Sequence, residues 1–167
     1  QAAKVCFQHQ RDFNYLEARH LWEDARIDSE GIHLAGMHYR ALIVEDDPPS
    51  QANNAMDVMA QAGRLIRWKE VTEPTEFVDA IDRLIPPDIE VSPETPDLRV
   101  RHMRKQDTDY YMLFNEGEGN LNVRLRLLAK GRRTLLDPTT GSQRSVTGDE
   151  PLSLARHAMR VLAVQQH

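Results

Sequence analysis

Apolar and polar residues alternate along three short runs between Asp109 and Gly141. Segments that contain Gly and Asn separate the runs, and residues 137–141, Asp-Pro-Thr-Thr-Gly, close the last one. Alternation with a period of two between such turn residues is typical of antiparallel strands that bury one face. We therefore predict that residues 98–167 form an antiparallel β-sandwich module.

The run 110–114 predicts a strand whose alternation places Phe114 and Tyr111 on opposite faces. We expect Phe114 to pack into the core, where Leu125 and Leu135 from neighbouring strands would contact it. Tyr111 would then face solvent or the surface of a partner.

Residues 1–86 mix helical and strand patterns, and they predict an α/β module. A helix is expected to start at a cap formed by Asn14, and a hairpin is expected around Gly31. The apolar, β-branched run 39–44 is of the kind that is buried in a parallel sheet.

A helix and a second strand follow that run, so the pattern predicts a parallel β-α-β unit. Apolar residues recur at helical spacing from Ala52 to Met59, and Gly63 stands where helices often end. The second strand is expected over residues 65–68. A further amphipathic helix is expected to begin at Thr75.

A proline-rich segment separates the two modules, with four prolines within residues 86–96. Proline removes a backbone donor and favours extended chain, also at the residue before it. We therefore expect a Pro-rich linker over residues 87–97.

The chain has 167 residues and a formal net charge of −5. This charge argues against a nucleic-acid partner, which usually requires a basic surface. We interpret the local basic run from Arg99 to Lys105 as a solvated strand face. No apolar run approaches the roughly 18 residues that span a bilayer, so no membrane partner is expected.

Cys6 is the only cysteine, which excludes an internal disulfide and a cysteine-based zinc site. We recognise no signal peptide, but the chain begins with Gln1 rather than Met, so a preceding segment is left open. The localisation is therefore unknown, with bacterial cytoplasm and a secreted or periplasmic location both retained.

Several motifs occur in an order that resembles a known enzyme family. They are Asp-Phe-Asn-Tyr-Leu at 12–16, Tyr-Arg-Ala-Leu-Ile-Val at 39–44, Ala-Gly at 62–63, Leu-Arg-Val-Arg-His at 98–102, Phe-Asn-Glu at 114–116 and Asp-Pro-Thr-Thr-Gly at 137–141. Together they resemble the region after the catalytic barrel in bacterial proteins similar to family 106 glycoside hydrolases, the α-L-rhamnosidase type. The resemblance covers nearly the whole chain.

The resemblance implies a partial flavodoxin-like α/β module, related to glutamine amidotransferases but without their nucleophile, followed by a β-sandwich. An additional strand and helix usually precede the 12–16 segment in such modules. Only residues 4–7 are available here, so the α/β module is expected to be truncated. The tail 151–165 fits a helix or strands, and the resemblance to enzyme sandwiches favours strands although helix propensity favours a helix.

The resemblance also implies that the family's catalytic carboxylates lie in the barrel, outside these residues. We therefore assign no catalytic residue and no cofactor to this chain. The expected partner is the remainder of the parent enzyme, the catalytic barrel, and carbohydrate is a further candidate ligand.

Glu45, Asp46 and Asp47 follow directly after the expected strand 39–44 and are the sharpest metal candidates. Carboxylates at the carboxyl end of a strand suit Mg²⁺, and the segment resembles the opening of phospho-receiver domains. A receiver also requires a second strand ending in Asp and then a helix, whereas residues 87–91 are followed by Ser-Pro. We therefore expect a solvated acidic loop without metal, and a divergent phospho-receiver is an alternative.

His33 and His38 could bind a metal together with Asp28, but two histidines without a fixed third ligand are a weak pattern. We interpret them as surface residues of a hairpin. Adjacent carboxylates such as Glu23 and Asp24 diverge on a helix, so they do not form an acid–base pair.

These observations favour a non-catalytic accessory region of a glycoside hydrolase, which supports a catalytic barrel absent from this chain. A carbohydrate-binding module is the first alternative. It would need an exposed aromatic ring, because sugars stack on such rings through their apolar faces. We expect the strongest aromatic candidates, Phe114 and Trp68, to lie in the core instead.

Overall fold

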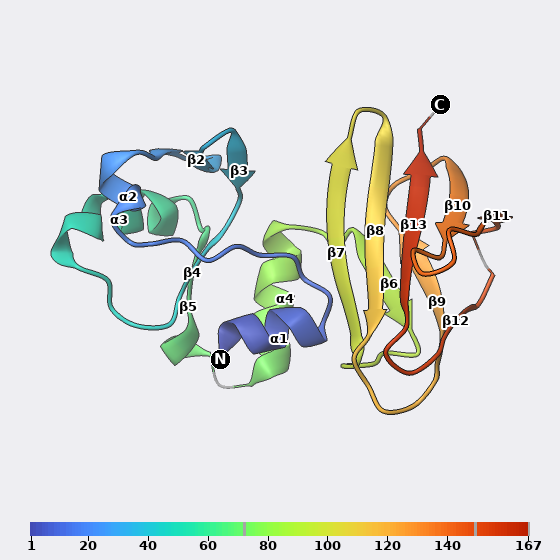
Figure 1. Cartoon of the computed structure of the whole chain (residues 1–167). Coiled ribbons are helices and arrows are strands. Elements are labelled where there is room, and N and C mark those ends of the chain that lie inside the picture. Colours follow the sequence, from blue (N-terminus) through green and yellow to red (C-terminus); the bar gives the residue numbers. More distant parts are fainter. Residues whose placement is uncertain (72, 149, 167) are drawn as a thin grey trace. The chain divides into compact units, whose positions relative to one another are not determined.

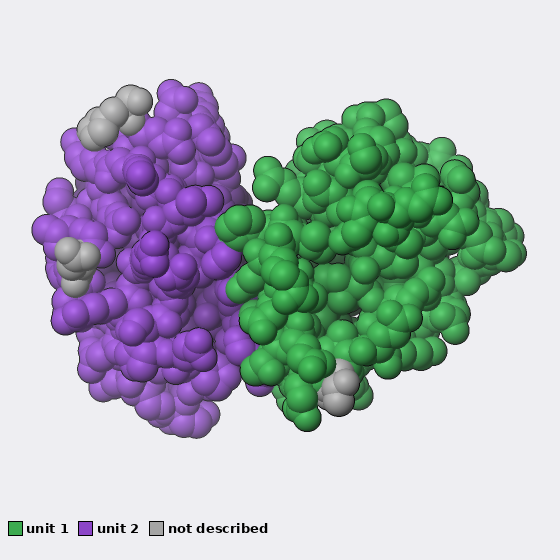
Figure 2. Space-filling model, turned by 180° about the vertical axis from the view of Figure 1, so that it is seen from behind, with its two compact units in different colours: residues 1–5, 13–86 green, residues 6–12, 87–167 purple. Residues whose placement is uncertain are grey.

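The computed structural model describes residues 1–71, 73–148 and 150–166, and the chain divides into two compact units (Figure 1, Figure 2). Unit 1 comprises residues 1–5 and 13–86, and unit 2 comprises residues 6–12 and 87–167. Most of the described strands pair antiparallel, and the helices are few and short. The predicted α+β fold, with two modules of which one is a β-sandwich, is confirmed.

Three short antiparallel strands form the first sheet of unit 1: β1 (Arg26–Asp28), β2 (Gly31–Leu34) and β3 (Met37–Tyr39). The hairpin predicted around Gly31 is therefore confirmed. Gly31 has a φ of +141°, and a Cβ built on it would lie 2.2 Å from the carbonyl oxygen of Tyr39. Only glycine allows β2 to approach the backbone of β3 this closely.

A parallel β-α-β unit follows in unit 1. Strand β4 (Leu42–Val44) pairs in parallel with β5 (Leu65–Arg67), and they are connected by η1 (Ser50–Ala52) and α3 (Asn53–Gln61). Helix α3 buries Met56 and Met59 on the predicted face, and Gly63 follows it with a φ of +68°. The β-α-β prediction is confirmed, although the expected strand 39–44 is divided between β3 and β4.

Helix α4 (Pro74–Leu84) is the further amphipathic helix that the sequence predicts. Its N-cap is Glu73 rather than Thr75, and the Glu73 amide donates to Oε2 of Glu76 at 3.4 Å. This capping box satisfies a backbone donor that the first helical turn leaves open. The buried face carries Phe77, Val78 and Ile81.

Trp68 opens the short helix η2 (Trp68–Glu70) and packs against α4. Its ring meets Phe77 edge-on, with the two ring centroids 5.1 Å apart. Such T-shaped pairs are a favoured aromatic geometry. Trp68 is half-buried in this contact, so it is a packing residue of unit 1.

The helix predicted to start at Asn14 is wrong. Residues 11–17 are not helical, and only the short helix α2 (His20–Glu23) forms in this region. The side-chain nitrogen of Asn14 donates to the hydroxyl of Tyr39 at 3.3 Å, which is a tertiary contact rather than a helix cap. Residues 4–7 lie in helix α1 (Ala2–Gln8).

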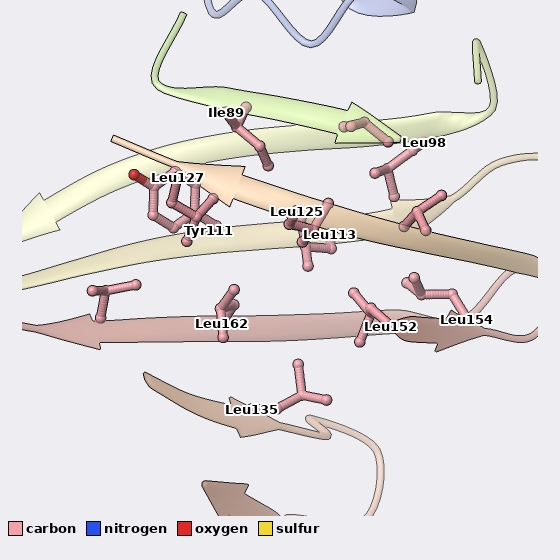
Figure 3. Packing of buried hydrophobic residues seen from close by; sticks show 13 residues of the cluster. Ile89, Leu98, Tyr111, Leu113, Leu125, Leu127, Leu135, Leu152, Leu154 and Leu162 are labelled. Atoms are coloured by element: carbon pink, nitrogen blue, oxygen red, sulfur yellow. The ribbon is translucent and has the colours of Figure 1, made fainter. Parts of the chain in front are cut away.

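Unit 2 consists of two antiparallel sheets. The larger sheet has the strand order β11-β10-β13-β8-β7, and the smaller sheet has the order β12-β9-β6. The strands are β6 (Ile89–Ser92), β7 (Leu98–Lys105), β8 (Thr108–Asn115), β9 (Leu121–Leu127), β10 (Arg132–Leu136), β11 (Gln143–Val146), β12 (Leu152–Leu154) and β13 (Met159–Gln165). Figure 3 shows the core, in which Ile89, Tyr111 and leucines from both sheets lie between the strands.

The segment 87–97, predicted to be a linker, contains strand β6. This strand pairs with β9 in the smaller sheet and buries Ile89 and Val91. Prolines stand on both sides of the strand but not within it, so its backbone donors remain available for pairing. The tail 151–165 forms β12 and β13, as the resemblance predicts, and not a helix.

The predicted faces of β8 are wrong. Tyr111 and Leu113 have no exposed surface, whereas Phe114 is 36% exposed. Leu125 and Leu135 are buried as predicted, but the residues of β8 that share their core are Tyr111 and Leu113.

Asn115 at the end of β8 explains which face is buried. Its side-chain nitrogen donates to the carbonyl oxygens of Gly119, Leu154 and Ala155 at 2.7, 3.2 and 3.0 Å, and it has no exposed surface. A buried amide is tolerated because its hydrogen bonds are made. Since side chains alternate, Tyr111 lies on the same face as Asn115 and Phe114 lies on the other.

Replacement of Tyr111 by Ala is expected to lower the free energy of unfolding by about 3–5 kcal/mol, because truncating a large buried side chain leaves a cavity. Phe114→Ala on the same strand is the matched control, and it should cost clearly less because its ring is partly in solvent. Urea denaturation followed by circular dichroism compares the two variants. Equal losses would contradict the assignment of the two faces.

Candidate functional site

The acidic loop that the sequence suggests as a metal candidate lies in solvent. The side chains of Asp46 and Asp47 are 91% and 82% exposed, and Nζ of Lys69 lies 3.5 Å and 3.9 Å from their carboxylate oxygens. Glu45 has a different partner, since its Oε1 accepts a hydrogen bond from the amide of Ala2 at 2.8 Å. Asp46 and Asp47 therefore share Lys69, whereas Glu45 interacts with a different group of unit 1.

The structure brings the two candidate histidines together. His33 and His38 lie opposite each other on β2 and β3, and their rings stack with centroids 4.4 Å apart and 4° between the planes. Nε2 of His33 lies 3.4 Å from Oδ2 of Asp28, and Nε2 of His38 lies 3.0 Å from the carbonyl oxygen of Glu30. Within the described ranges, no three His, Cys, Asp or Glu side chains are grouped to hold a metal.

Phe114 is the aromatic ring that the structure places on the outside of the sandwich. It lies on the outer face of β8, directly opposite Met159 of β13, which is equally exposed at 36%. Tyr110 and Met112 share this face, because they alternate with the buried residues of β8. The result is an apolar stripe on the outer face of the larger sheet.

The sequence analysis missed a cluster of titratable side chains in unit 2. His102 on β7 has Nδ1 2.6 Å from Oδ2 of Asp88 and Nε2 2.9 Å from Oδ1 of Asp109. Asp88 precedes β6 of the smaller sheet, while Asp109 lies on β8 of the larger sheet. The imidazole therefore links the two sheets of the sandwich.

Two further side chains hold this cluster in place. The ring of Tyr111 stacks on the His102 imidazole, with centroids 4.4 Å apart and 6° between the planes. The Asp109 side chain is only 5% exposed, and its Oδ2 accepts a hydrogen bond from Nε2 of Gln166 at 2.9 Å. The position of the imidazole is thus fixed from its ring face and from both of its nitrogens.

The carboxylates favour the protonated form of His102. The hydrogen bond with Asp88 raises the pKa of His102 above its usual value, the hydrogen bond with Asp109 adds to this, and burial opposes both. Only an imidazolium can donate from both nitrogens at once. Burial, together with the charges of Asp88 and Asp109, raises the pKa of Tyr111 to about 12, so its hydroxyl stays protonated.

Burial also affects the pKa of Asp12, a further carboxyl group near the cluster. Desolvation raises the pKa of Asp12, the ion pair and hydrogen bond with Arg101 oppose this shift, and the charge of Asp88 adds to it. Asp12 belongs to the segment 6–12 of unit 2, so the polar cluster includes residues from the start of the chain.

The cluster does not have the arrangement of a glycosidase acid–base pair. Such a pair flanks an open space, with carboxyl groups about 5–10 Å apart, that receives the glycosidic bond. Here Asp88 and Asp109 bond to the same imidazole, which fills the space between them. A hollow of about 660 Å³ borders the cluster and is also lined by Arg104 and Lys130. What the arrangement does is cross-link the two sheets.

The contact between His102 and Asp109 could have been predicted from the sequence of the β7–β8 hairpin. The turn at Gln106 and Asp107 sets the register of the β7–β8 hairpin, which places His102 opposite Tyr111. Asp109 is then a diagonal neighbour of His102, within reach of a long side chain. Asp88 could not be found in this way, because it lies just before a strand of the other sheet.

Comparison with protein-family models finds no match, and comparison with curated proteins finds none either. Among solved structures, a rhamnosidase from Novosphingobium sp. PP1Y is similar, with 15% identity and a TM-score of 0.65 over 95% of this chain and 20% of that chain. The apo exo-carrageenase GH42 from Bacteroides ovatus matches 76% of this chain and 18% of its own, with 14% identity and a TM-score of 0.46. Gan42B, a GH42 β-galactosidase from G. stearothermophilus, matches 56% of this chain and 13% of its own, with 18% identity and a TM-score of 0.38.

The chain spans about a fifth of the length of the rhamnosidase and of the exo-carrageenase that it matches. The likeness to the rhamnosidase runs through both units and shows a shared fold. The structural neighbours are thus glycoside hydrolases of which this chain resembles only a small part. None of the described helices is long and apolar enough to cross a membrane.

The stability of the protein should depend on pH through His102. The folded state raises its pKa, so its contribution is full below about pH 6.5, the unfolded value, and is lost as the pH rises through the folded pKa. We expect the melting temperature to fall as the pH rises above about 6.5, and to fall less steeply in His102→Gln. His38→Gln is the control, because that ring lies in unit 1. A profile left unchanged by His102→Gln would contradict the linkage.

Addition of Mg²⁺ should leave the melting temperature of the protein unchanged. A ligand raises the melting temperature only if it binds the native state, and the exposed carboxylates of Asp46 and Asp47 already interact with Lys69. Differential scanning fluorimetry with Mg²⁺ and with Na⁺ at equal ionic strength separates binding from screening. A shift specific to Mg²⁺ that Asp46→Asn and Asp47→Asn abolish would restore the metal hypothesis.

Proposed function

We propose that this chain is a non-catalytic accessory region of a glycoside hydrolase, which supports a catalytic barrel contributed by other parts of a longer polypeptide. The observation that carries the proposal is the likeness to the Novosphingobium rhamnosidase, which includes 95% of this chain but only 20% of that chain. Both units therefore recur, in one polypeptide, as a minor part of a larger protein named as a glycosidase.

The finer proposal follows from the motifs of the sequence. The order of the segments 12–16, 39–44, 98–102 and 137–141 supports a region after the barrel like that of family 106-type rhamnosidases. The parallel β4-α3-β5 unit supports the description of unit 1 as a partial flavodoxin-like module. The sandwich of unit 2 follows it in the chain in the expected order.

The chemistry of the described residues also supports a non-catalytic role. Asp88 and Asp109 are held around one imidazole, which occupies the space between the two carboxylates. The exposure of Asp46 and Asp47 argues against the phospho-receiver alternative, in which an acidic residue would lie in a pocket with Lys and Thr.

The outer face of the larger sheet is the surface we assign to the rest of the parent enzyme. Phe114, Met159 and Met103 are large apolar residues with 36%, 36% and 51% exposure on adjacent strands of this sheet. An exposed apolar patch of this kind marks an interaction surface. The remainder of a longer polypeptide is the occupant, because the chain corresponds to a fifth of the rhamnosidase.

Carbohydrate binding is a second candidate function, and the exposure of Phe114 is the observation that favours it. A ring on the outer face of a sheet can stack against the apolar face of a sugar. The neighbour of Phe114 on β13 is Met159 rather than a second ring, and the other ring on this face of β8, Tyr110, lies four residues away along the strand.

The purified chain should not hydrolyse para-nitrophenyl α-L-rhamnoside or β-D-galactoside, because no carboxylate pair among the described residues flanks a space for the glycosidic bond. Release of nitrophenol measured against a buffer blank checks this expectation. The product of the complete reading frame should hydrolyse one such glycoside. Turnover by the chain itself that a single Asp or Glu substitution abolishes would refute the accessory role.

The docking surface is tested in that complete product. Phe114→Asp should lower its melting temperature, because it places a charge in a buried apolar interface. Leu128→Asp is the matched control, since Leu128 is 65% exposed and lies beyond the end of β9. Equal melting temperatures for the two variants, together with loss of sugar binding in Phe114→Asp, would favour the carbohydrate-binding function instead.

A further inference from the structure

A groove of about 830 Å³ lies in unit 2, along strands β6 and β9 of the smaller sheet. Its volume is in the range of small-ligand sites. The outward residues of the two strands lie side by side, with Glu90 opposite Arg126 and Ser92 opposite Arg124. Segment 8–11 and residues 94–96 border the groove, as do Arg133 and Gly148.

The wall formed by segment 8–11 is held firmly. Gln10 has a φ of +55°, in the left-handed region that is uncommon for residues other than glycine. Its side-chain nitrogen lies 2.9, 3.2 and 2.9 Å from the carbonyl oxygens of Gln8, Thr95 and Leu98. These bonds tie the segment to the chain that connects β6 and β7, so the wall is preformed.

The groove is basic although the chain is acidic. Four arginines and two glutamates line it, whereas the whole chain has a net charge of −5. The arginines come from four separate places in unit 2: segment 8–11, two outward positions of β9, and β10. A groove with an excess of positive charge attracts ligands of negative charge.

The guanidinium groups differ in their partners. Arg126 Nη1 lies 3.2 Å from Oε2 of Glu90, and Arg133 Nη1 donates to the carbonyl oxygen of Gly148 at 3.2 Å. Arg124 is an exposed residue of β9. Its guanidinium has no hydrogen-bond or ion-pair partner among the described residues. Arg124 is therefore the group with all of its donors available to a ligand.

The backbone of β9 adds a second feature to this groove. Strand β12 pairs with β9 only at residues 121–123, and β6 pairs with residues 124–127 from the other side. The edge of residues 124–127 that faces away from β6 thus has no strand partner in the described part of the sheet. Hydrogen-bonding groups of the backbone lie on this edge next to the arginines.

We propose that this groove binds an acidic saccharide, whose carboxylate or sulfate group lies against the guanidinium of Arg124. A guanidinium presents parallel N–H donors that match the oxygens of such an oxyanion. No Phe, Tyr or Trp is among the described residues that line the groove, so recognition uses these donors rather than ring stacking. The saccharide part of the inference rests on the proposed role in a glycoside hydrolase, and the oxyanion part rests on the groove itself.

Isothermal titration calorimetry with the intact chain tests the inference. The probes are a tetragalacturonate, a sulfated tetrasaccharide, the neutral maltotetraose and inorganic sulfate. We expect one of the two acidic saccharides to bind more tightly than maltotetraose and sulfate, and the comparison of the two identifies carboxylate or sulfate as the group bound. Binding should weaken as salt rises, because charges on a protein surface are screened beyond about 8 Å at physiological ionic strength.

Arg124→Gln should weaken binding of that acidic saccharide about tenfold or more, as for loss of a hydrogen bond to a charged group. Arg132→Gln is the matched control, because it removes the same charge from β10 of unit 2 outside the groove. Circular dichroism spectra of both variants confirm that the sandwich is folded.

Three results would overturn the inference: no binding of either acidic probe, equal affinity for acidic and neutral tetrasaccharides, or equal losses in Arg124→Gln and Arg132→Gln. Affinity for inorganic sulfate as strong as for the acidic saccharides would overturn the saccharide part. These outcomes are separate from the tests of the accessory role, which use glycoside turnover by the chain itself and the Phe114→Asp variant.

Discussion

The inward row of side chains on β8 is the constraint on which the rest of unit 2 depends. Asp109, Tyr111, Leu113 and Asn115 form this row, and their burial excludes the alternative register in which Phe114 would face the core. The hydrogen bonds of Asn115 fix one end of the row, and those of Asp109 fix the other. Because a strand alternates with a period of two, each of these residues determines the face of its neighbours.

The same alternation produces three groups of side chains with different chemistry. The inward residues of β7 and β8 continue from an apolar core into the ion pairs of His102 with Asp88 and Asp109. The outward residues of β8 form the apolar stripe that contains Phe114. The outward residues of β9 place Arg124 and Arg126 beside Glu90 of β6. The sandwich thus combines one core, an ion-paired cluster that continues from this core, and two outer surfaces of different chemistry.

Much of the fold followed from local patterns. Glycine and proline positions, apolar alternation and helical spacing predicted the hairpin at Gly31, the β4-α3-β5 unit, helix α4 and the strands of the sandwich. Errors arose where a side chain had two available roles. Asn14 was interpreted as a helix cap, but its amide bonds to Tyr39. The prolines around residues 89–92 suggested a linker, although the strand between them is paired with β9.

The sequence by itself determined the two-module order, the antiparallel character of the second module and the lack of a recognisable catalytic motif, because these depend on spacing along the chain. Only the tertiary structure decided which face of each strand is buried and which charged residues meet. Asp88 reaches His102 across two sheets, and Arg124 meets segment 8–11 in one groove although these residues are far apart in sequence. Such contacts follow from how sheets pack, and alternation alone is equally consistent with either face being inside.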